Sequence, residues 1–430
     1  MRLSGRLSAA IEILTDFEAR RVPLKTAIAD WARSNRYAGA KDRAFISGLC
    51  LDALRRRRSL AASMDDDSTR AATLGAVRFL WKQSAEDIAA AVVEEHGPGA
   101  LSEPEEAALA SEVLTSAVDY PEWLEPQIAR VFGDGAAQVM NAFCERADID
   151  LRLNTLKAAP DKALAALKTV KAEEIPLLKT AARIAAPDSS EKAPGVTVIP
   201  AFNKGWVEVQ DLGSQIAASA AGDIKGAQVL DYCAGGGGKT LALAAMMENT
   251  GQLYAYDRDA RRLKPLFHRA KRAGIRNLQI RSPAGGEGLD DIEGKMDVVF
   301  VDAPCTGAGT WRRHPDTKWR LTEKQLQTRM AEQDKVLEKA SRFVKPGGRL
   351  VWVTCSFLME ENEDRLAAFL ETHQEFSRAP VLNFMEQSGL LTEEGKAALQ
   401  PCVTPDGAIR ITPDKIRADG FFVAALIKAA

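Results

Sequence analysis

The 430-residue sequence lacks most of the features that place a protein in a specialised class. Its six cysteines are widely separated and form no Cys-x-x-Cys pair, which argues against a zinc site, a thioredoxin-like site and a disulfide framework. The uncharged apolar run near the C-terminus, Phe421 to Ile427, is far too short to span a bilayer. Because the net charge is only −2, a surface that binds nucleic acid must be a local basic patch.

The N-terminus shows no signal peptide, since Glu12 and Asp16 interrupt the stretch where an apolar segment would form. The sequence contains neither an internal repeat nor a low-complexity tract. These absences predict a cytosolic protein with free thiols, no membrane association and no bound metal. An apolar content of 46% and a charged content of 27% are typical of globular proteins, and the length predicts two or three domains.

Three regions differ in their pattern of apolar residues. Residues 1–135 repeat apolar side chains every three or four positions, which predicts a helical bundle. Residues 136–215 combine an alternating stretch at 149–157, a helical pattern at 161–170 and a short expected strand at 195–200, which predicts a small α+β domain. From residue 216 to 430 strands alternate with helices, which predicts a doubly wound parallel sheet.

Two β-branched runs in the last region each end in a turn that contains a cysteine. The run from Val298 to Gly307 holds Cys305, and the run from Arg349 to Phe357 holds Cys355. A lone cysteine at a strand end is more often a small core residue than a nucleophile. Reactive groups of parallel sheets lie beyond the carboxyl ends of the strands, however, so two such turns predict a two-cysteine active site.

A glycine-rich loop, LDYCAGGGGKT from Leu230 to Thr240, follows the first strand of this region. It fails the phosphate-binding pattern, because the first glycine of that pattern falls at Cys233, and it fails the dinucleotide pattern, because the last glycine falls at Thr240. S-adenosylmethionine needs a looser turn and an acid after the next strand, which is present as Asp257. The alternative is that the glycines only close a tight turn.

A thiolate beside S-adenosylmethionine has a well-defined use in the methylation of pyrimidines. Addition of the thiolate to C6 makes C5 nucleophilic enough to accept a methyl group, and loss of the C5 proton then releases the enzyme. The scheme needs a nucleophile, a second group that helps release and an acid near N3 of the base. Cys355, Cys305 and Asp302 are the candidates for these roles.

These motifs resemble the Nop/Sun family of RNA cytosine-5 methyltransferases, and within it the bacterial Fmu/RsmB type that acts on 16S ribosomal RNA. The matching segments are Leu151–Lys157, Val209–Gln215, Asp231–Thr240, Tyr256–Leu263, Asp302–Trp319, Val353–Ser356 and Asp419–Ala424. The resemblance implies a NusB-like helical RNA-binding domain at 1–135, an RRM-like middle domain at 136–215 and a Rossmann-like methyltransferase domain at 216–430. It is weaker for the first domain, where Lys41–Arg58 carries it.

The resemblance also implies roles for individual residues. Cys355 is the nucleophile, Cys305 promotes product release and Asp302 faces N3 of the base. The implied cofactor contacts are Cys233, Ala234, Gly235, Gly236, Gly237, Gly238, Lys239, Asp257, Arg262 and Asp302. The sequence departs from the family in three places. Gly235 and Gly236 replace Ala and Pro, residues 282–284 replace a Gly-Asp step that contacts the adenosine, and Asp414 stands in a segment where a histidine is common.

Two basic segments are candidates for RNA contact. Arg55–Arg58 forms either a solvated helix C-terminus or a set of phosphate contacts. Thr310–Arg320 interleaves aromatic and basic side chains directly after Cys305, as in proteins that stack and clamp unpaired nucleotides. The predicted RNA-binding residues are Arg55, Arg56, Arg57, Arg58, Arg312, Arg313, His314, Lys318 and Trp319.

We therefore expect a monomeric methyltransferase that uses S-adenosylmethionine to modify a flipped or unpaired cytosine, with small-subunit ribosomal RNA as the expected substrate. One alternative is a tRNA cytosine-5 methyltransferase. Another is a non-catalytic RNA-binding or ribosome-assembly factor with a degraded cofactor site, which the altered glycine loop motivates.

Overall fold

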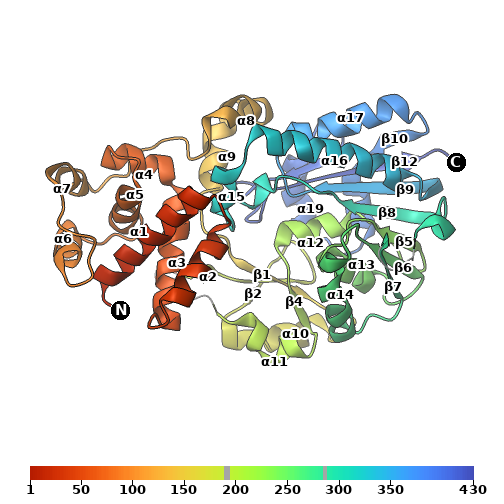
Figure 1. Ribbon diagram of the computed structural model, residues 1–430. Coiled ribbons are helices and arrows are strands. Elements are labelled where there is room, and N and C mark those ends of the chain that lie inside the picture. The colour runs from red at the N-terminus through yellow and green to blue at the C-terminus, as the bar shows by residue number, and fades with distance from the viewer. Residues whose placement is uncertain (188–193, 284–287) are drawn as a thin grey trace. The chain divides into compact units, whose positions relative to one another are not determined.

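The computed structural model describes residues 1–187, 194–283 and 288–430 (Figure 1). The chain forms two compact units. The first gathers Met1–Arg146, residues 186–187 and Trp311–Leu321, and the second gathers Ala147–Ala185, Pro194–Thr310 and Thr322–Ala430. Residues 147–185 and 194–215 of the expected middle domain lie within the second unit, so the three-domain division stays a prediction. No helix in the described ranges is long and apolar enough to cross a membrane.

The first unit is all-helical, as the three- and four-residue spacing predicts. In α1 (Leu3–Arg20), Leu7, Ala10, Leu14 and Phe17 are buried on one face and pack into the core of the unit. The other helices are α2 (Leu24–Ser34), α3 (Ala40–Arg55), α4 (Arg57–Met64), α5 (Thr69–Gly75), α6 (Ala85–Val93), α7 (Glu103–Leu109), α8 (Glu125–Phe132), α9 (Ala136–Ala142) and α15 (Pro315–Arg320), with a π-helical turn η1 at Ala76–Leu80.

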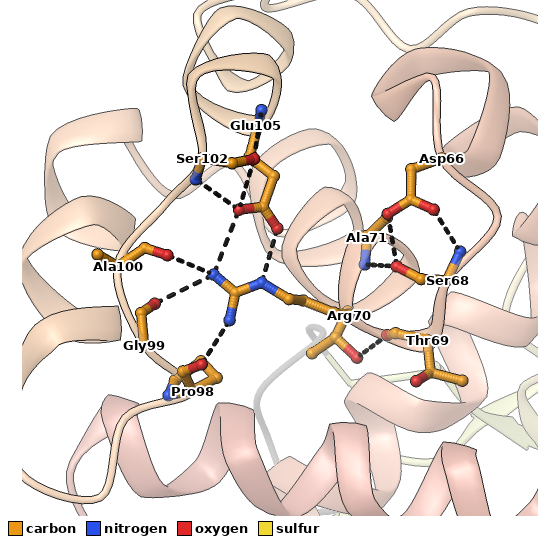
Figure 2. A network of polar contacts seen from close by, with 11 residues as sticks. Asp66, Ser68, Thr69, Arg70, Ala71, Pro98, Gly99, Ala100, Ser102 and Glu105 are labelled. Atoms are coloured by element: carbon orange, nitrogen blue, oxygen red, sulfur yellow. Dashed lines mark hydrogen bonds and ion pairs between the residues drawn. The ribbon is translucent and has the colours of Figure 1, made fainter.

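One arginine ties the loop before α7 to the start of α5 (Figure 2). Arg70 Nε donates to Glu105 Oε1 at 2.6 Å, and Nη1 donates to the Pro98 carbonyl at 2.6 Å. Nη2 donates to the carbonyls of Gly99 and Ala100, each at 3.0 Å. A single guanidinium thus satisfies three carbonyl groups of a loop that has no regular secondary structure.

The small sheet of the second unit has the order β2-β3-β1-β4, and all three neighbouring pairs are antiparallel. Its elements are β1 (Ile149–Leu153), α10 (Pro160–Ala165), β2 (Glu173–Glu174), β3 (Ala181–Ile184), α11 (Pro200–Asn203) and β4 (Val207–Val209). The α+β prediction is confirmed. The strand expected at 195–200 is wrong, because Val196–Val198 forms a 3-10 turn that leads directly into α11.

The large sheet has the order β10-β12-β9-β8-β5-β6-β7, with β11 paired to β12. Its strands are β5 (Gln228–Asp231), β6 (Gln252–Tyr256), β7 (Leu278–Arg281), β8 (Met296–Asp302), β9 (Val344–Thr354), β10 (Phe376–Ala379), β11 (Ile409–Ile411) and β12 (Phe421–Lys428). β5 to β9 run parallel, whereas β12 runs antiparallel to β9 and β10. The predicted Rossmann-like sheet is therefore present, with an antiparallel edge.

Helices cover both faces of this sheet (Figure 1). The sheet's helices are α12 (Leu212–Ser219), α13 (Gly238–Met246), α14 (Ala260–Ala273), α16 (Glu323–Ser341), α17 (Glu363–Thr372), α18 (Val381–Gln387) and α19 (Glu393–Leu399). Leu230 and Trp352 point to the core beneath α16 and α17, whereas Val229 and Val353 point to the core beneath α12 and α18. The strand order reverses between β5 and β8, and ligands of such sheets bind beyond that point.

Candidate active site

The carboxyl ends of β8 and β9 bring the two predicted cysteines together. Asp302, the last residue of β8, pairs with Val353 near the end of β9, and each strand continues into its cysteine turn. The Sγ atoms of Cys305 and Cys355 are 3.4 Å apart. Two thiols from turns 50 residues apart in sequence are thus within hydrogen-bonding distance.

The environment of the two sulfur atoms is asymmetric. The hydrogen bond with Cys355 raises the pKa of Cys305, and burial and the charges of Glu361 and Asp302 act in the same direction. Cys305 therefore carries its proton at neutral pH and can donate it in a hydrogen bond to the Cys355 sulfur. Such a donor stabilises negative charge on Cys355, and the thiolate is the reactive form of cysteine.

A buried lysine lies beside the cysteine pair. Lys239 Nζ, from the first turn of α13, is 2.8 Å from Asp302 Oδ2 and 5.1 Å from the centre of the Phe421 ring. Burial alone would lower the pKa of Lys239, but the charge and hydrogen bond of Asp302, together with smaller contributions from Cys355 and Asp231, raise it. Asp302 keeps 34% of its side chain exposed, so it remains accessible to a ligand.

The glycine loop between β5 and α13 adopts conformations that favour glycine. Gly235 has φ of +52° and Gly237 has φ of +86°. A Cβ atom on Gly237 would lie 2.3 Å from Leu266 Cδ1, whereas one on Gly238 would meet no atom within 4 Å. Gly235, which stands where the family has alanine, thus has a left-handed backbone conformation that glycine adopts without strain.

The predicted ribose-binding acid lies against this loop. Gly235 N–H donates to Asp257 Oδ2 at 3.0 Å, and Arg262 Nη1 lies 3.2 Å from the same oxygen. Cys233 and Ala234 form the turn itself, where Ala234 N–H donates to the carbonyl of Tyr256 at 2.9 Å. The structure therefore gathers the predicted cofactor residues at one edge. Ala284, one of the residues that replace the family's Gly-Asp step, lies outside the described residues.

Asp231, at the end of β5, belongs to this site and was not predicted. It is fully buried, and its Oδ2 accepts a hydrogen bond from Thr240 Oγ1 at 2.6 Å, while Oδ1 has no hydrogen-bond partner within the described residues. Burial raises the pKa of Asp231 to about 7. An unsatisfied buried carboxylate oxygen fits a cationic ligand such as S-adenosylmethionine. The sequence could have indicated Asp231, because it is an acidic residue at the end of the strand that precedes the glycine loop.

The basic segment after Cys305 does not lie as predicted. Arg312 and Lys318 are buried in the helical unit. Arg55 Nη2 donates to the Arg312 carbonyl at 2.9 Å, Lys318 Nζ donates to the Arg55 carbonyl at 3.2 Å, and Trp319 Nε1 donates to the Leu54 carbonyl at 2.6 Å. Their burial argues against RNA contact by Arg55, Arg312 and Lys318. In the same segment Arg313 is half-buried and His314 is exposed.

The arginine run at 55–58 is divided between two helices, because α3 ends at Arg55 and α4 begins at Arg57. Arg56 Nη1 donates to Asn141 Oδ1 at 2.6 Å, Arg57 Nη1 lies 2.5 Å from Glu18 Oε1, and Arg58 Nη2 lies 2.8 Å from Glu122 Oε1. Each arginine therefore has a partner within the helical unit, and the interpretation as one solvated helix terminus is wrong.

Comparisons with known proteins agree with this geometry. The sequence model of the family described as 16S rRNA methyltransferase RsmB/F matches residues 223–427. The chain is 30% identical over 315 residues to a probable ribosomal RNA small subunit methyltransferase B of Synechocystis, covering 72% of this chain and 67% of that protein. It is 31% identical over 312 residues to ribosomal RNA small subunit methyltransferase B of Photorhabdus laumondii, covering 72% and 66%. These alignments span about two thirds of each relative.

A solved structure is similar over the same share of the chain. The crystal structure of a methyltransferase homologue from Pyrococcus horikoshii covers 72% of this chain and 95% of its own, with 28% identity and a TM-score of 0.56.

Proposed function

Because the chain belongs to the 16S rRNA methyltransferase RsmB/F family, we propose that it methylates C5 of a cytosine in RNA through a covalent adduct between Cys355 and C6. The family membership supports S-adenosylmethionine as the methyl donor and small-subunit ribosomal RNA as the substrate. The observation that carries the cytosine-5 chemistry is the pair of Sγ atoms 3.4 Å apart at the ends of β8 and β9.

The residues around the glycine loop fit the cofactor. Gly238 leaves the backbone open to a ligand, since a Cβ atom there would meet no atom within 4 Å. Asp257 would hold ribose hydroxyls, and Asp231 offers an unpaired oxygen to positive charge. When bound, S-adenosylmethionine supplies a methyl group on a positively charged sulfur, which C5 of the base accepts.

The two thiols divide the remaining work. The Cys355 thiolate adds to C6 and forms an S–C6 bond. The C5=C6 electron pair shifts to C4–C5 and the C4=N3 pair moves onto N3, which takes up a proton, so C5 becomes a nucleophilic enamine carbon. After methylation a base takes the C5 proton, C5=C6 re-forms and the S–C6 electron pair returns to Cys355. The Cys305 thiol stabilises this leaving thiolate by a hydrogen bond. Asp302, oriented by Lys239, would face N3 of the base.

We propose RNA-binding roles for the two other parts of the chain. Lys41–Arg58 resembles the NusB-like domain of the bacterial branch, which supports a NusB-like helical unit. The order β2-β3-β1-β4 and the sequence strand, helix, two strands, helix, strand support an RRM-like small sheet. Arg313 and His314 keep exposed surface in the segment after Cys305 and are the proposed RNA contacts there. The protein would act as a cytosolic monomer.

The test is a denaturing gel of the Cys305→Ala variant incubated with small-subunit ribosomal RNA and S-adenosylmethionine. We expect a covalent protein–RNA band, because release is slow without the Cys305 thiol, and we expect it to disappear in the Cys305→Ala/Cys355→Ala double variant. Absence of the band without cofactor binding by the wild type would indicate a non-catalytic RNA-binding factor. Absence of the band with intact cofactor binding would indicate another RNA, such as tRNA.

A further inference from the structure

A buried carboxylate that the mechanism above does not use lies against the turn of Cys305. Glu361 is 0% exposed. Its Oε1 accepts a hydrogen bond from Thr306 N–H at 2.8 Å, and its Oε2 accepts one from Thr306 Oγ1 at 2.6 Å. Gln333 Nε2 donates both to Glu361 Oε1 at 3.3 Å and to the Pro304 carbonyl at 2.9 Å. Both neighbours of Cys305 in the sequence are therefore bound to this buried cluster.

The same segment of chain also holds the turn of Cys355. The Ser356 hydroxyl hydrogen-bonds to Glu361, and the adjacent Asn362 Nδ2 donates to the Ser356 carbonyl at 2.9 Å. Thr354 Oγ1 donates to Asn362 Oδ1 at 2.5 Å. Thr354, Ser356 and Asn362 are fully buried like Glu361. Glu361 thus binds one sequence neighbour of Cys305, and the adjacent Asn362 binds both sequence neighbours of Cys355.

Burial of the Glu361 carboxylate lowers the stability of the fold, which suggests that the residue serves a function. Burial raises the pKa of Glu361, and the hydrogen bonds from Ser356 and Thr306 oppose that shift by favouring the charged form. An apolar side chain of similar size would avoid the desolvation of a carboxylate. The charge of Glu361 also acts on Cys305, where it favours the protonated thiol.

We propose that Glu361 is a positioning residue, which holds the Cys305 turn against the Cys355 turn so that the Cys305 thiol stays aimed at the Cys355 sulfur. Glu361 acts through Cys305 and contacts neither base nor cofactor. The proposal rests on the proposed function, because the positioned thiol matters for release of the adduct.

The test compares Glu361→Gln with Glu363→Gln. Glu363 is a buried carboxylate in the same segment, but it pairs with Arg410 instead of the cysteine turns. In the gel described above, we expect Glu361→Gln to accumulate the covalent RNA adduct and to lower turnover about tenfold to a hundredfold, since small displacements of reacting groups have effects of this size. Glu363→Gln should release the adduct as the wild type does.

A double-mutant comparison separates positioning from general damage. If Glu361 acts only through the Cys305 thiol, Glu361→Gln should lower turnover no further in a Cys305→Ala background. An additive loss, or wild-type turnover and release in Glu361→Gln, would overturn the proposal. If Glu361→Gln does not fold, Thr306→Val removes one of its bonds and should show the same behaviour in weaker form.

A readout without RNA keeps the two proposals distinguishable. Phenylarsine oxide bridges two nearby thiols, forming two As–S bonds and releasing one water. We expect tight binding to the wild type that Cys305→Ala abolishes and that Glu361→Gln weakens at least tenfold, because a pre-organised pair binds more tightly. Unchanged arsenical binding in Glu361→Gln would overturn the positioning role. If arsenical binding is lost in Cys305→Ala and weakened in Glu361→Gln as expected, but no variant forms an adduct with RNA, only the proposed function is overturned.

Discussion

Lys239 Nζ lies 2.8 Å from Asp302 Oδ2, so the first turn of α13 and the end of β8 are joined by a buried ion pair directly beside the two cysteines. Lys239 directly follows the glycine loop, so the ion pair connects this loop to Asp302, the acid proposed to face the base. Of the two partners, Lys239 is buried and Asp302 is partly exposed, so removal of Asp302 would leave a buried cation without its counter-charge.

We expect Lys239→Met to lower the rate of adduct formation with RNA by about a hundredfold, because the orientation of Asp302 is lost while the size of the side chain is kept. Single-turnover adduct formation measures this effect. In the Lys239→Met/Asp302→Asn double variant, thermal stability should recover while adduct formation stays slow. Recovery of activity in the double variant would show that the ion pair has a structural role only.

Alanine variants of Gly237 and Gly238 distinguish the effect of backbone strain on stability from the effect of the loop on ligand binding. Gly237→Ala should destabilise the fold by about 1–3 kcal/mol, since its Cβ would lie 2.3 Å from Leu266 Cδ1 at a left-handed φ. Gly238→Ala meets no atom within 4 Å and should keep wild-type stability, yet it should weaken S-adenosylmethionine binding if the loop approaches the cofactor. Thermal unfolding and calorimetric titration of both variants check this. Unchanged cofactor affinity in Gly238→Ala would mean that the glycines only close a turn.

Cofactor binding should depend on pH through Asp231. Its pKa is raised to about 7, so its negative charge appears as the pH rises through neutrality. The charged fraction of such a group rises from roughly one tenth at pH 6 to roughly nine tenths at pH 8, so affinity for a cationic cofactor should increase about tenfold over this interval. Isothermal titration at both pH values measures it, and Asp231→Asn should bind weakly with no such slope.

The same carboxyl should affect stability in the opposite direction. A folded-state pKa above the unfolded value means that the protonated form stabilises the fold, fully below about pH 4, and that this contribution is lost as the pH rises through about 7. The cofactor-free wild type should therefore lose stability relative to Asp231→Asn between pH 5 and pH 8. Parallel denaturant titrations of the two proteins that showed no divergence would contradict the raised pKa.

The loop that Arg70 holds in the helical unit should open when the guanidinium is removed (Figure 2). Arg70→Met loses a partly buried ion pair and three carbonyl contacts, which we expect to lower local stability by about 2 kcal/mol. Hydrogen exchange of the amides in α5 and α7 measures it. Arg2→Met, which removes an exposed ion pair with Glu94, is the control and should change little.

The parts of the site that could be predicted are those fixed by strand ends. The runs before Cys305 and Cys355 are strands because they are apolar and β-branched, and parallel strands place their following turns at one edge. Asp257 lies against the glycine loop for the same reason. Asp231 was not predicted, because the sequence does not show that one of its oxygen atoms is buried without a hydrogen-bond partner.

Long-range contacts and local helix boundaries explain the other differences. Arg312 and Lys318 look like solvent-exposed basic residues next to the cysteine turn, but their partners lie about 260 positions earlier in the chain, which no local pattern reveals. The arginines at 55–58 are divided by a helix break and each has its own partner. Val196–Val198 has β-branched residues, yet Pro200 begins a helix immediately afterwards and leaves no room for a strand.

The membership of Trp311–Leu321 in the helical unit has a consequence for dissection of this protein. The chain passes from one unit to the other several times, including at 146–147, 185–186, 310–311 and 321–322, so the two units are not separable by a single cut. A fragment that starts at residue 147 would expose the buried side chains of Trp311, Arg312 and Lys318 a few residues from Cys305. The shortest stable fragment that contains the cysteine pair therefore includes the N-terminal helices.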